Sequence, residues 1–333
     1  MTLFALLGSI ETGIIFAIMA LGVYLTFRIL DFPDLTVDGS FVTGGAVAAV
    51  MIFFGYPPIL ASFSALIIGF FVGCITGILH TRGKINPLLS GILMMTALYS
   101  INLRIMGLTF EDRPTRPNIP LLDNDTIFTP IDQWSQALGI ESYATIIYLG
   151  MIALIFKFIT DIFLKTEIGL AIRATGDNKR MIRSFSANTD SLTILGLGIS
   201  NAYVAFAGSL FAQYNKFADV NMGIGMIVVG LASVIIGEAL FGKKTIARAT
   251  FAVLCGAIIY RIIIGFALAN KWLDSSDQRL ITALIVIFAL VLPKWIENYR
   301  NQKRKKKRTN AATIEKGKGG SLHAEVGKHQ QNL

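Results

Sequence analysis

Residues 8–30 read GSIETGIIFAIMALGVYLTFRIL and decide the fold class. The stretch carries Glu11 near its start and Arg28 near its end, and no charged residue stands between them. About 20 consecutive, mostly apolar residues are long enough for a helix to cross the hydrocarbon core of a bilayer. The stretch therefore predicts a transmembrane helix.

The same pattern recurs along the rest of the chain. Further apolar runs lie at 40–56, 58–79, 88–106, 143–164, 191–214, 225–242, 249–270 and 279–297. We therefore expect nine spans, within a range of eight to ten, and an all-α, polytopic transmembrane helical bundle. The runs 40–56 and 225–242 are short and rich in glycine, which favours half-helices or broken spans there.

The composition supports a membrane protein made of one bundle and a tail. Hydrophobic residues make up 53% of the 333 residues and charged residues only 15%, and the mean hydropathy is +0.62. Soluble domains carry about 25% charged residues, so this chain has too few to cover a water-facing surface. We expect a transmembrane bundle over 1–298 and a basic, disordered tail over 299–333.

The basic residues predict the orientation of the bundle. They concentrate in the links 80–84, 165–183 and 243–248 and in the tail, which lie on one face if the nine spans alternate. Lys and Arg favour the cytoplasmic side, so the C-terminus is expected in the cytoplasm and the link 107–142 outside. The N-terminus is then outside, unless a half-span near 31–45 places it inside.

The basic run in the tail has two other interpretations. Residues 301–308 read NQKRKKKR, within a chain of net charge +9. Contact with the anionic headgroups of membrane lipids is compatible with a solvated, topology-fixing tail. Nucleic-acid binding has no support elsewhere in the chain, so no nucleic-acid partner is expected.

Catalytic and metal chemistry lack the residues they need. Cys74 and Cys255 lie in apolar runs without a CxxC pattern, and the three histidines, His80, His323 and His329, are scattered. Residues 237–244, GEALFGKK, come close to a P-loop, but Lys244 replaces the Ser or Thr that would hold magnesium. We expect no catalytic residue, no metal, no cofactor and no ATPase activity in this chain.

The largest cytoplasmic link, 165–190, is expected to contain more than a connection. Good helix formers stand between Gly169 and Gly176, with basic residues such as Arg173 around them. This pattern predicts a short helix in a compact basic loop. It is either a topology anchor or a docking element for a cytoplasmic partner, and the composition favours neither.

Three polar residues within the spans are candidates for lining a translocation pathway: Asn102, Asn201 and Glu238. Polar and ionisable groups in a membrane usually face the interior of the bundle or water. Hydrogen bonding between helices is an alternative for each of them.

Two stretches of the chain echo each other weakly. LTFRILDFPDLTVDGSF (25–41) and LFAQYNKFADVNMGIGM (210–226) each join a helix end to an aromatic residue, an aspartate and a glycine-rich start. Inverted repeats would place two such stretches on opposite faces, and chance explains the match equally well.

The sequence resembles the permease subunits of ATP-binding cassette (ABC) importers of the branched-chain amino acid and ribose type, and most of all the tryptophan and tyrosine transport branch. Four stretches carry the likeness: IFAIMALGVYLTFRILDFPDLTVDGSFVTGGAVAA (15–49), GKINPLLSGILMMTALYSINLRIMG (83–107), EIGLAIRATGDN (167–178) and GIGMIVVGLASVIIGEALFG (223–242).

The resemblance implies a type II-like importer fold with inverted repeats, in a bacterial cell membrane. It implies a second permease subunit, as a homodimer, cytoplasmic ABC ATPase subunits, and an extracytoplasmic solute-binding protein that delivers a small solute such as an aromatic amino acid. In this family a cytoplasmic helix contacts the ATPase. The matching segment here, 166–178, would give the coupling role to Gly169, Arg173, Ala174 and Gly176.

Two other functions remain open. A secondary transporter or channel would need ion sites or a pore at the midplane, for which Glu238 is the main candidate. A membrane-embedded enzyme would need a nucleophile–base pair or metal ligands within the spans, where no histidine is expected.

Overall fold

The computed structural model describes residues 3–109, 115–138, 141–185 and 187–268, together with residues 280, 283, 284 and 287. The chain divides into units 1–286 and 287–333, and the architecture below belongs to the first. The basic tail and nearly all of the expected span 279–297 lie outside the described residues.

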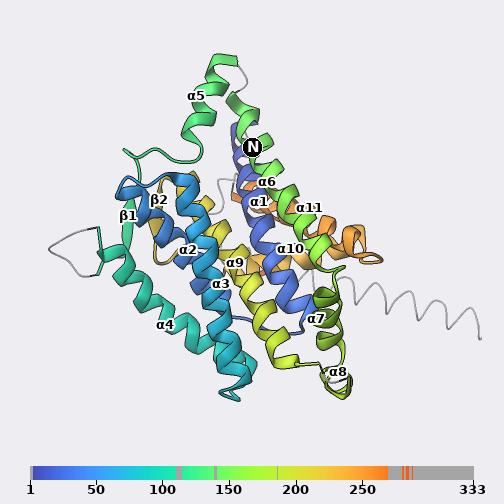
Figure 1. Cartoon of the computed structure of the whole chain (residues 1–333). Coiled ribbons are helices and arrows are strands. Elements are labelled where there is room, and N and C mark those ends of the chain that lie inside the picture. The colour runs from blue at the N-terminus through green and yellow to red at the C-terminus, as the bar shows by residue number, and fades with distance from the viewer. Residues whose placement is uncertain are drawn as a thin grey trace, which may run out of the picture. The chain divides into compact units, whose positions relative to one another are not determined.

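The described helices confirm a polytopic all-α bundle (Figure 1). Seven are long and apolar enough to cross a membrane: α1 (Leu3–Val23, continued by the π-helix η1, Tyr24–Ile29), α2 (Thr36–Phe53), α3 (Pro58–Thr81), α4 (Pro87–Gly107), α6 (Glu141–Phe163), α9 (Thr189–Asn215) and α11 (Ile246–Leu268). The apolar helix α10 (Met226–Phe241) is shorter. These eight helices coincide with the first eight predicted runs.

Short elements mark the two ends of the bundle. The helix α5 (Thr129–Leu138) and the antiparallel pair β1 (Asn118–Pro120) and β2 (Phe217–Asp219) lie toward one end. The helices α7 (Glu167–Asp177) and α8 (Lys179–Ser184) lie at the other end (Figure 1). The short helix predicted between Gly169 and Gly176 is α7.

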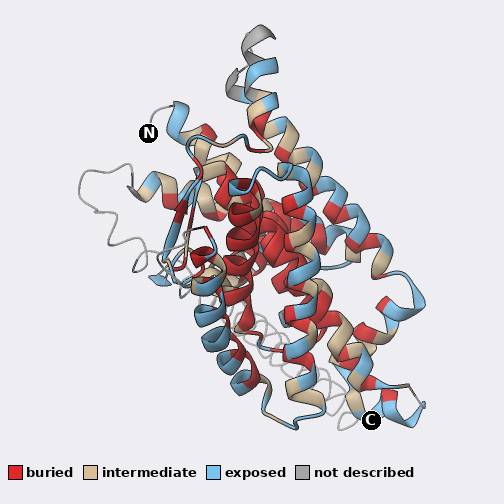
Figure 2. Ribbon diagram, turned by 60° about the vertical axis from the view of Figure 1, so that its left-hand side comes forward, coloured by how far each residue is buried: buried red, intermediate tan, exposed pale blue. Residues whose placement is uncertain are grey.

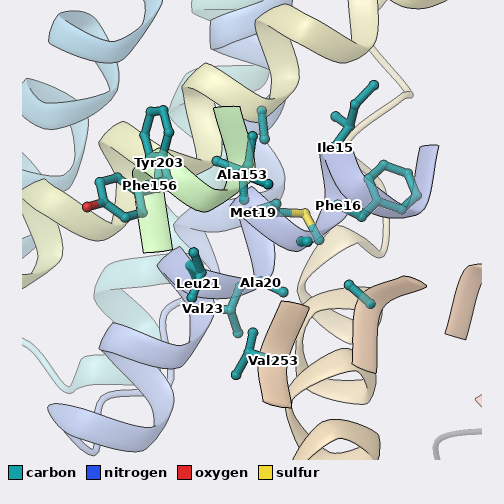
Figure 3. Packing of buried hydrophobic residues seen from close by; sticks show 14 of the residues in the cluster. Ile15, Phe16, Met19, Ala20, Leu21, Val23, Ala153, Phe156, Tyr203 and Val253 are labelled. Carbon is teal, nitrogen blue, oxygen red and sulfur yellow. The ribbon is translucent and has the colours of Figure 1, made fainter. Parts of the chain in front are cut away.

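The core forms around α1. Its residues Ile15, Ile18 and Met19 are fully buried, and Phe156 of α6, Tyr203 of α9 and Val253 of α11 belong to the same cluster (Figure 3). Buried residues gather on the inner helices, whereas long outer helix faces are exposed (Figure 2). Those outer faces are apolar, as expected of side chains that contact lipid.

Glycines let the inner helices approach closely. A Cβ atom on Gly44 of α2 would overlap the backbone of Ala205 in α9, and one on Gly208 of α9 would overlap the carbonyl of Phe41 in α2. Small residues at such crossings strengthen van der Waals packing between membrane helices. The glycines of the second run therefore serve close packing between α2 and α9.

The first three described α-helices, α1 to α3, pack against the last three, α9 to α11, in matching pairs. Helix α3 packs along α9, as α11 packs along α1; α2 packs against α9, as α10 packs against α1. This arrangement is the one that two interlocked repeats produce. The stretches 25–41 and 210–226 occupy equivalent positions in it.

Candidate functional site

Helix α10 begins inside the bundle, beside α2. The chain leaves β2, passes through residues 220–225, and turns at Gly225, whose φ of +85° favours glycine. The Asp38 carboxylate, in the first turn of α2, accepts hydrogen bonds from the Gly225 nitrogen at 2.9 Å and the Ile227 nitrogen at 2.8 Å. The carboxylate thus satisfies free N–H groups and the positive end of the helix dipole.

A second aspartate plays the equivalent part at the start of α2. Asp34 lies between the first two spans and is buried, and its Oδ1 accepts a hydrogen bond from the Thr36 nitrogen at 2.9 Å. Burial raises the pKa of the Asp34 carboxyl, and hydrogen bonds from Thr36 and Asn201 offset part of that rise. The first turns of α2 and α10 are therefore each bound by an aspartate carboxylate, buried at Asp34 and half-buried at Asp38.

Asn201, one of the three pathway candidates, belongs to this network. Its Nδ2 donates to Asp34 Oδ2 at 2.7 Å, and its Oδ1 accepts from the Ser40 hydroxyl at 2.6 Å. The side chain is fully buried, so it joins α9 to the start of α2. This is the helix–helix hydrogen bonding that was the alternative to lining a pathway.

Asn102, the second candidate, lines a cavity of about 340 Å³ between α2, α4 and residues 220–224. Its Nδ2 donates to the Gly39 carbonyl at 3.3 Å. Its Oδ1 has no hydrogen-bond partner among the described residues, although only 1% of the residue is exposed. The cavity walls are Asp38, Gly39, Val42, Met95, Thr96, Tyr99, Asn102, Val220, Gly223 and Ile224.

Glu238, the third candidate, lies apart from the other two. Its Oε1 accepts a hydrogen bond from Arg28 Nε at 2.9 Å, and this ion pair joins the end of α10 to η1. The side chains of Arg28 and Glu238 are 38% and 17% exposed. Glu238 therefore lies near the α7 end of the bundle and does not line the cavity at Asn102.

The four residues expected to couple to an ATPase all lie on α7. Thr166 starts the helix, and its hydroxyl accepts a hydrogen bond from the Gly169 nitrogen at 3.2 Å. A Cβ atom on Gly169 would overlap the Phe163 carbonyl, and one on Gly176 would overlap the Ile29 carbonyl. These two glycines therefore seat α7 against the ends of α6 and η1.

A second cavity, of about 590 Å³, lies beside the contact between α7 and the end of η1. Arg173, Ala174 and Gly176 line it together with Arg28 and Asp31, whose φ is +53°. It also takes lining from Phe27, Ile29, Leu170 and Asp177. Charges of both signs at this end of the bundle suit a polar partner surface rather than lipid.

The sequence reasoning missed the two helix-starting aspartates. Asp34 lies two residues before α2, and Asp38 lies in its first turn, which are positions where Asp is typical of helix starts. It also missed the buried pair of Lys157 and Asp161 on α6, 2.6 Å apart. Their spacing of four residues was the available signal.

No group of three His, Cys, Asp or Glu residues close enough to hold a metal ion occurs within the described part of the chain.

Comparison with known proteins identifies the class. The family described as "Branched-chain amino acid transport system / permease component" matches residues 5–292. This chain belongs to that family, and it is a multi-pass membrane permease of the ABC transport type.

The names of individual relatives give different solutes. The chain is 43% identical to the tyrosine transport system permease protein of Clostridioides difficile (strain R20291) over 282 residues, which are 85% of this chain and 89% of that protein. It is 26% identical to the ribose import permease protein RbsC of Haemophilus influenzae over 285 residues, 84% of this chain and 82% of that protein. No solved structure gives a significant match.

Proposed function

We propose that this chain is the translocating subunit of an ABC importer that carries an amino acid with an aromatic side chain. A solute-binding protein delivers the solute at the end that bears α5 and the β1–β2 pair. Cytoplasmic ATPase subunits drive transport from the end that bears α7 and α8. Two copies of the chain enclose the pathway, and the C-terminus is cytoplasmic.

The observation that carries this proposal is α7, standing at the end of the bundle with apolar side chains exposed outside the spans. Ile168 and Leu170 are about half exposed, and Phe185, just after α8, is 73% exposed. Exposed apolar groups beside charged ones are typical of surfaces that bind another protein. Because α7 rests on η1 and α6 through glycines, a push on α7 reaches both spans.

The choice of solute rests on the relatives. A protein 43% identical over most of both chains is named for tyrosine transport, whereas those named for ribose are 26% identical or less. We therefore infer an aromatic amino acid rather than a sugar as the solute.

The first experiment is affinity capture of the full chain from native membranes. A stoichiometric ABC ATPase is expected with the wild-type chain, and it is expected to be lost from Arg173→Ala, Gly176→Ala and Leu170→Asp variants. Arg82→Ala is the matched control, because Arg82 is exposed on the link between α3 and α4 and lies outside the α7 cavity.

A different result would support a different function. If the wild-type chain is captured without an ATPase and still moves L-tyrosine into vesicles without ATP, the importer proposal is wrong. The chain would then be a secondary transporter or channel.

A further inference from the structure

The cavity at Asn102 has the size of a small-molecule site. Its volume of about 340 Å³ falls in the range of ligand pockets, roughly 300–1,000 Å³. Its walls come from the first turns of α2, from α4, and from the segment 220–224 that leads into the short helix α10. Transporters commonly place their solute beside helix ends and non-helical segments inside the bundle.

Most of the wall is apolar. Val42, Val220 and Ile224 supply aliphatic surface, and Met95 and Tyr99 stand on neighbouring turns of α4. Methionine sulfur and aromatic rings make favourable contacts with a planar ring. A ring-bearing solute therefore suits this wall better than a fully hydroxylated one.

Two polar side chains of the wall, Asp38 and Thr96, already have hydrogen-bond partners. The carboxylate of Asp38 is held by the N–H groups of Gly225 and Ile227, and the hydroxyl of Thr96 donates to the Ile92 carbonyl at 2.5 Å. A sugar would leave several of its hydroxyls without partners here, and buried polar groups without partners oppose binding. The wall thus discriminates against sugars.

Asn102 supplies a buried acceptor that no described residue uses. Asn102 Oδ1 is buried without a partner among the described residues, while its Nδ2 is anchored to the Gly39 carbonyl. A buried acceptor without a donor is costly, so it favours a ligand that brings one. A hydroxyl or N–H group on an aromatic ring is a donor of that kind.

We propose that this cavity is a binding site on the solute path, and that it binds the aromatic side chain of an amino acid whose ring carries a hydrogen-bond donor. Asn102 Oδ1 accepts that hydrogen bond, and Met95 and Tyr99 contact the ring. This proposal rests on the proposed function and adds to it the residues that select the solute.

Solute protection of an introduced cysteine tests whether the cavity is occupied. The chain carries Met95→Cys with Cys74→Ala and Cys255→Ala, and it is reconstituted in lipid nanodiscs with its captured ATPase and receptor. L-Tyrosine is expected to slow maleimide labelling at this position, and D-ribose is not. Leu93→Cys is the control, since Leu93 is exposed on α4 but does not line the cavity.

Selectivity tests Asn102 by a readout that a purely structural role would not move. ATP-driven uptake of L-tyrosine and of L-phenylalanine is compared at a saturating concentration of the solute-loaded binding protein. Phenylalanine is the comparison because its ring lacks the hydrogen-bond donor. Asn102→Leu is expected to reduce tyrosine uptake efficiency by about tenfold, the worth of one hydrogen bond, and to leave phenylalanine uptake nearly unchanged. Asn102→Asp, which keeps an acceptor, is expected to retain the preference for tyrosine.

The failures are distinguishable. If the wild-type complex transports tyrosine, but Asn102→Leu leaves the ratio of tyrosine to phenylalanine uptake unchanged and tyrosine does not protect Met95→Cys, the cavity proposal is wrong and the importer stands. Protection by a lipid acyl chain instead of the solute overturns it in the same way. A wild-type complex that transports no amino acid overturns both proposals.

Discussion

Gly223 shows how a single residue keeps the segment before α10 against α2. Its Cα lies so close to α2 that a Cβ atom there would overlap the backbone carbonyl of Asp38. The side-chain carboxylate of the same residue accepts a hydrogen bond at the start of α10. A side chain at this position must therefore displace the segment 220–225 from the wall of the cavity. Gly150 of α6 is the opposite case, because nothing lies within 4 Å of a Cβ built there.

The first prediction follows from this contrast. Gly223→Ala is expected to destabilise the protein by about 1–3 kcal/mol, as overpacking does, and to lower solute transport. Gly150→Ala is expected to be neutral or stabilising by up to about 1 kcal/mol, since alanine is the better helix former. Thermal unfolding of the detergent-solubilised chain measures both, and equal effects of the two substitutions would contradict the packing described here.

At the scale of elements, α6 connects the two functional ends of the bundle. It runs from the α5 end to α7, and near its α7 end the Lys157 ammonium and the Asp161 carboxylate form a buried ion pair at 2.6 Å. The other carboxylate oxygen of Asp161 accepts a hydrogen bond from Thr250 of α11 at 2.6 Å. Asp161 therefore holds the α7 end of α6 against α11.

The second prediction concerns this pair. Asp161→Leu leaves a buried lysine without its partner and is expected to destabilise the protein by about 3–5 kcal/mol. The double variant Lys157→Met with Asp161→Leu removes both charges, and it is expected to recover most of that loss. Thermal unfolding of the single and double variants provides the comparison.

An exposed ion pair serves as the control for the second prediction. Arg183 and Asp190 are 3.0 Å apart, and their side chains are 64% and 49% exposed. Arg183→Met is expected to change stability by less than about 1 kcal/mol. A double variant no more stable than Asp161→Leu alone would show that the loss in the single variant does not come from the unpaired lysine.

At the scale of the whole molecule, the orientation in the membrane sets which partner meets which end. The third prediction is that Leu122→Cys, beside β1, reacts with a membrane-impermeant maleimide in intact cells. Arg180→Cys, on α8, is expected to react only after the membrane is permeabilised. Both are made in the Cys74→Ala and Cys255→Ala background, and the reverse pattern would invert the proposed topology.

The sequence by itself determined the membrane class, the eight described apolar helices and the short helix α7. These features depend on length, hydropathy and local helix propensity, which are properties of contiguous residues. It also selected Asn102, which lines the cavity, but it gave Asn201 and Glu238 the same weight. Only their partners, Asp34 and Ser40 for Asn201 and Arg28 for Glu238, distinguish the three.

The tertiary structure alone decided where α10 starts, and which aspartates accept hydrogen bonds from the first N–H groups of α2 and α10. Asp38 and Gly225 are 187 residues apart in the chain, and Asp34 and Asn201 are 167 apart. No local pattern specifies such pairs, because they form when helices distant in sequence pack through glycines into one bundle. The cavity at Asn102 exists for the same reason, since its walls come from three segments that meet only in the folded chain.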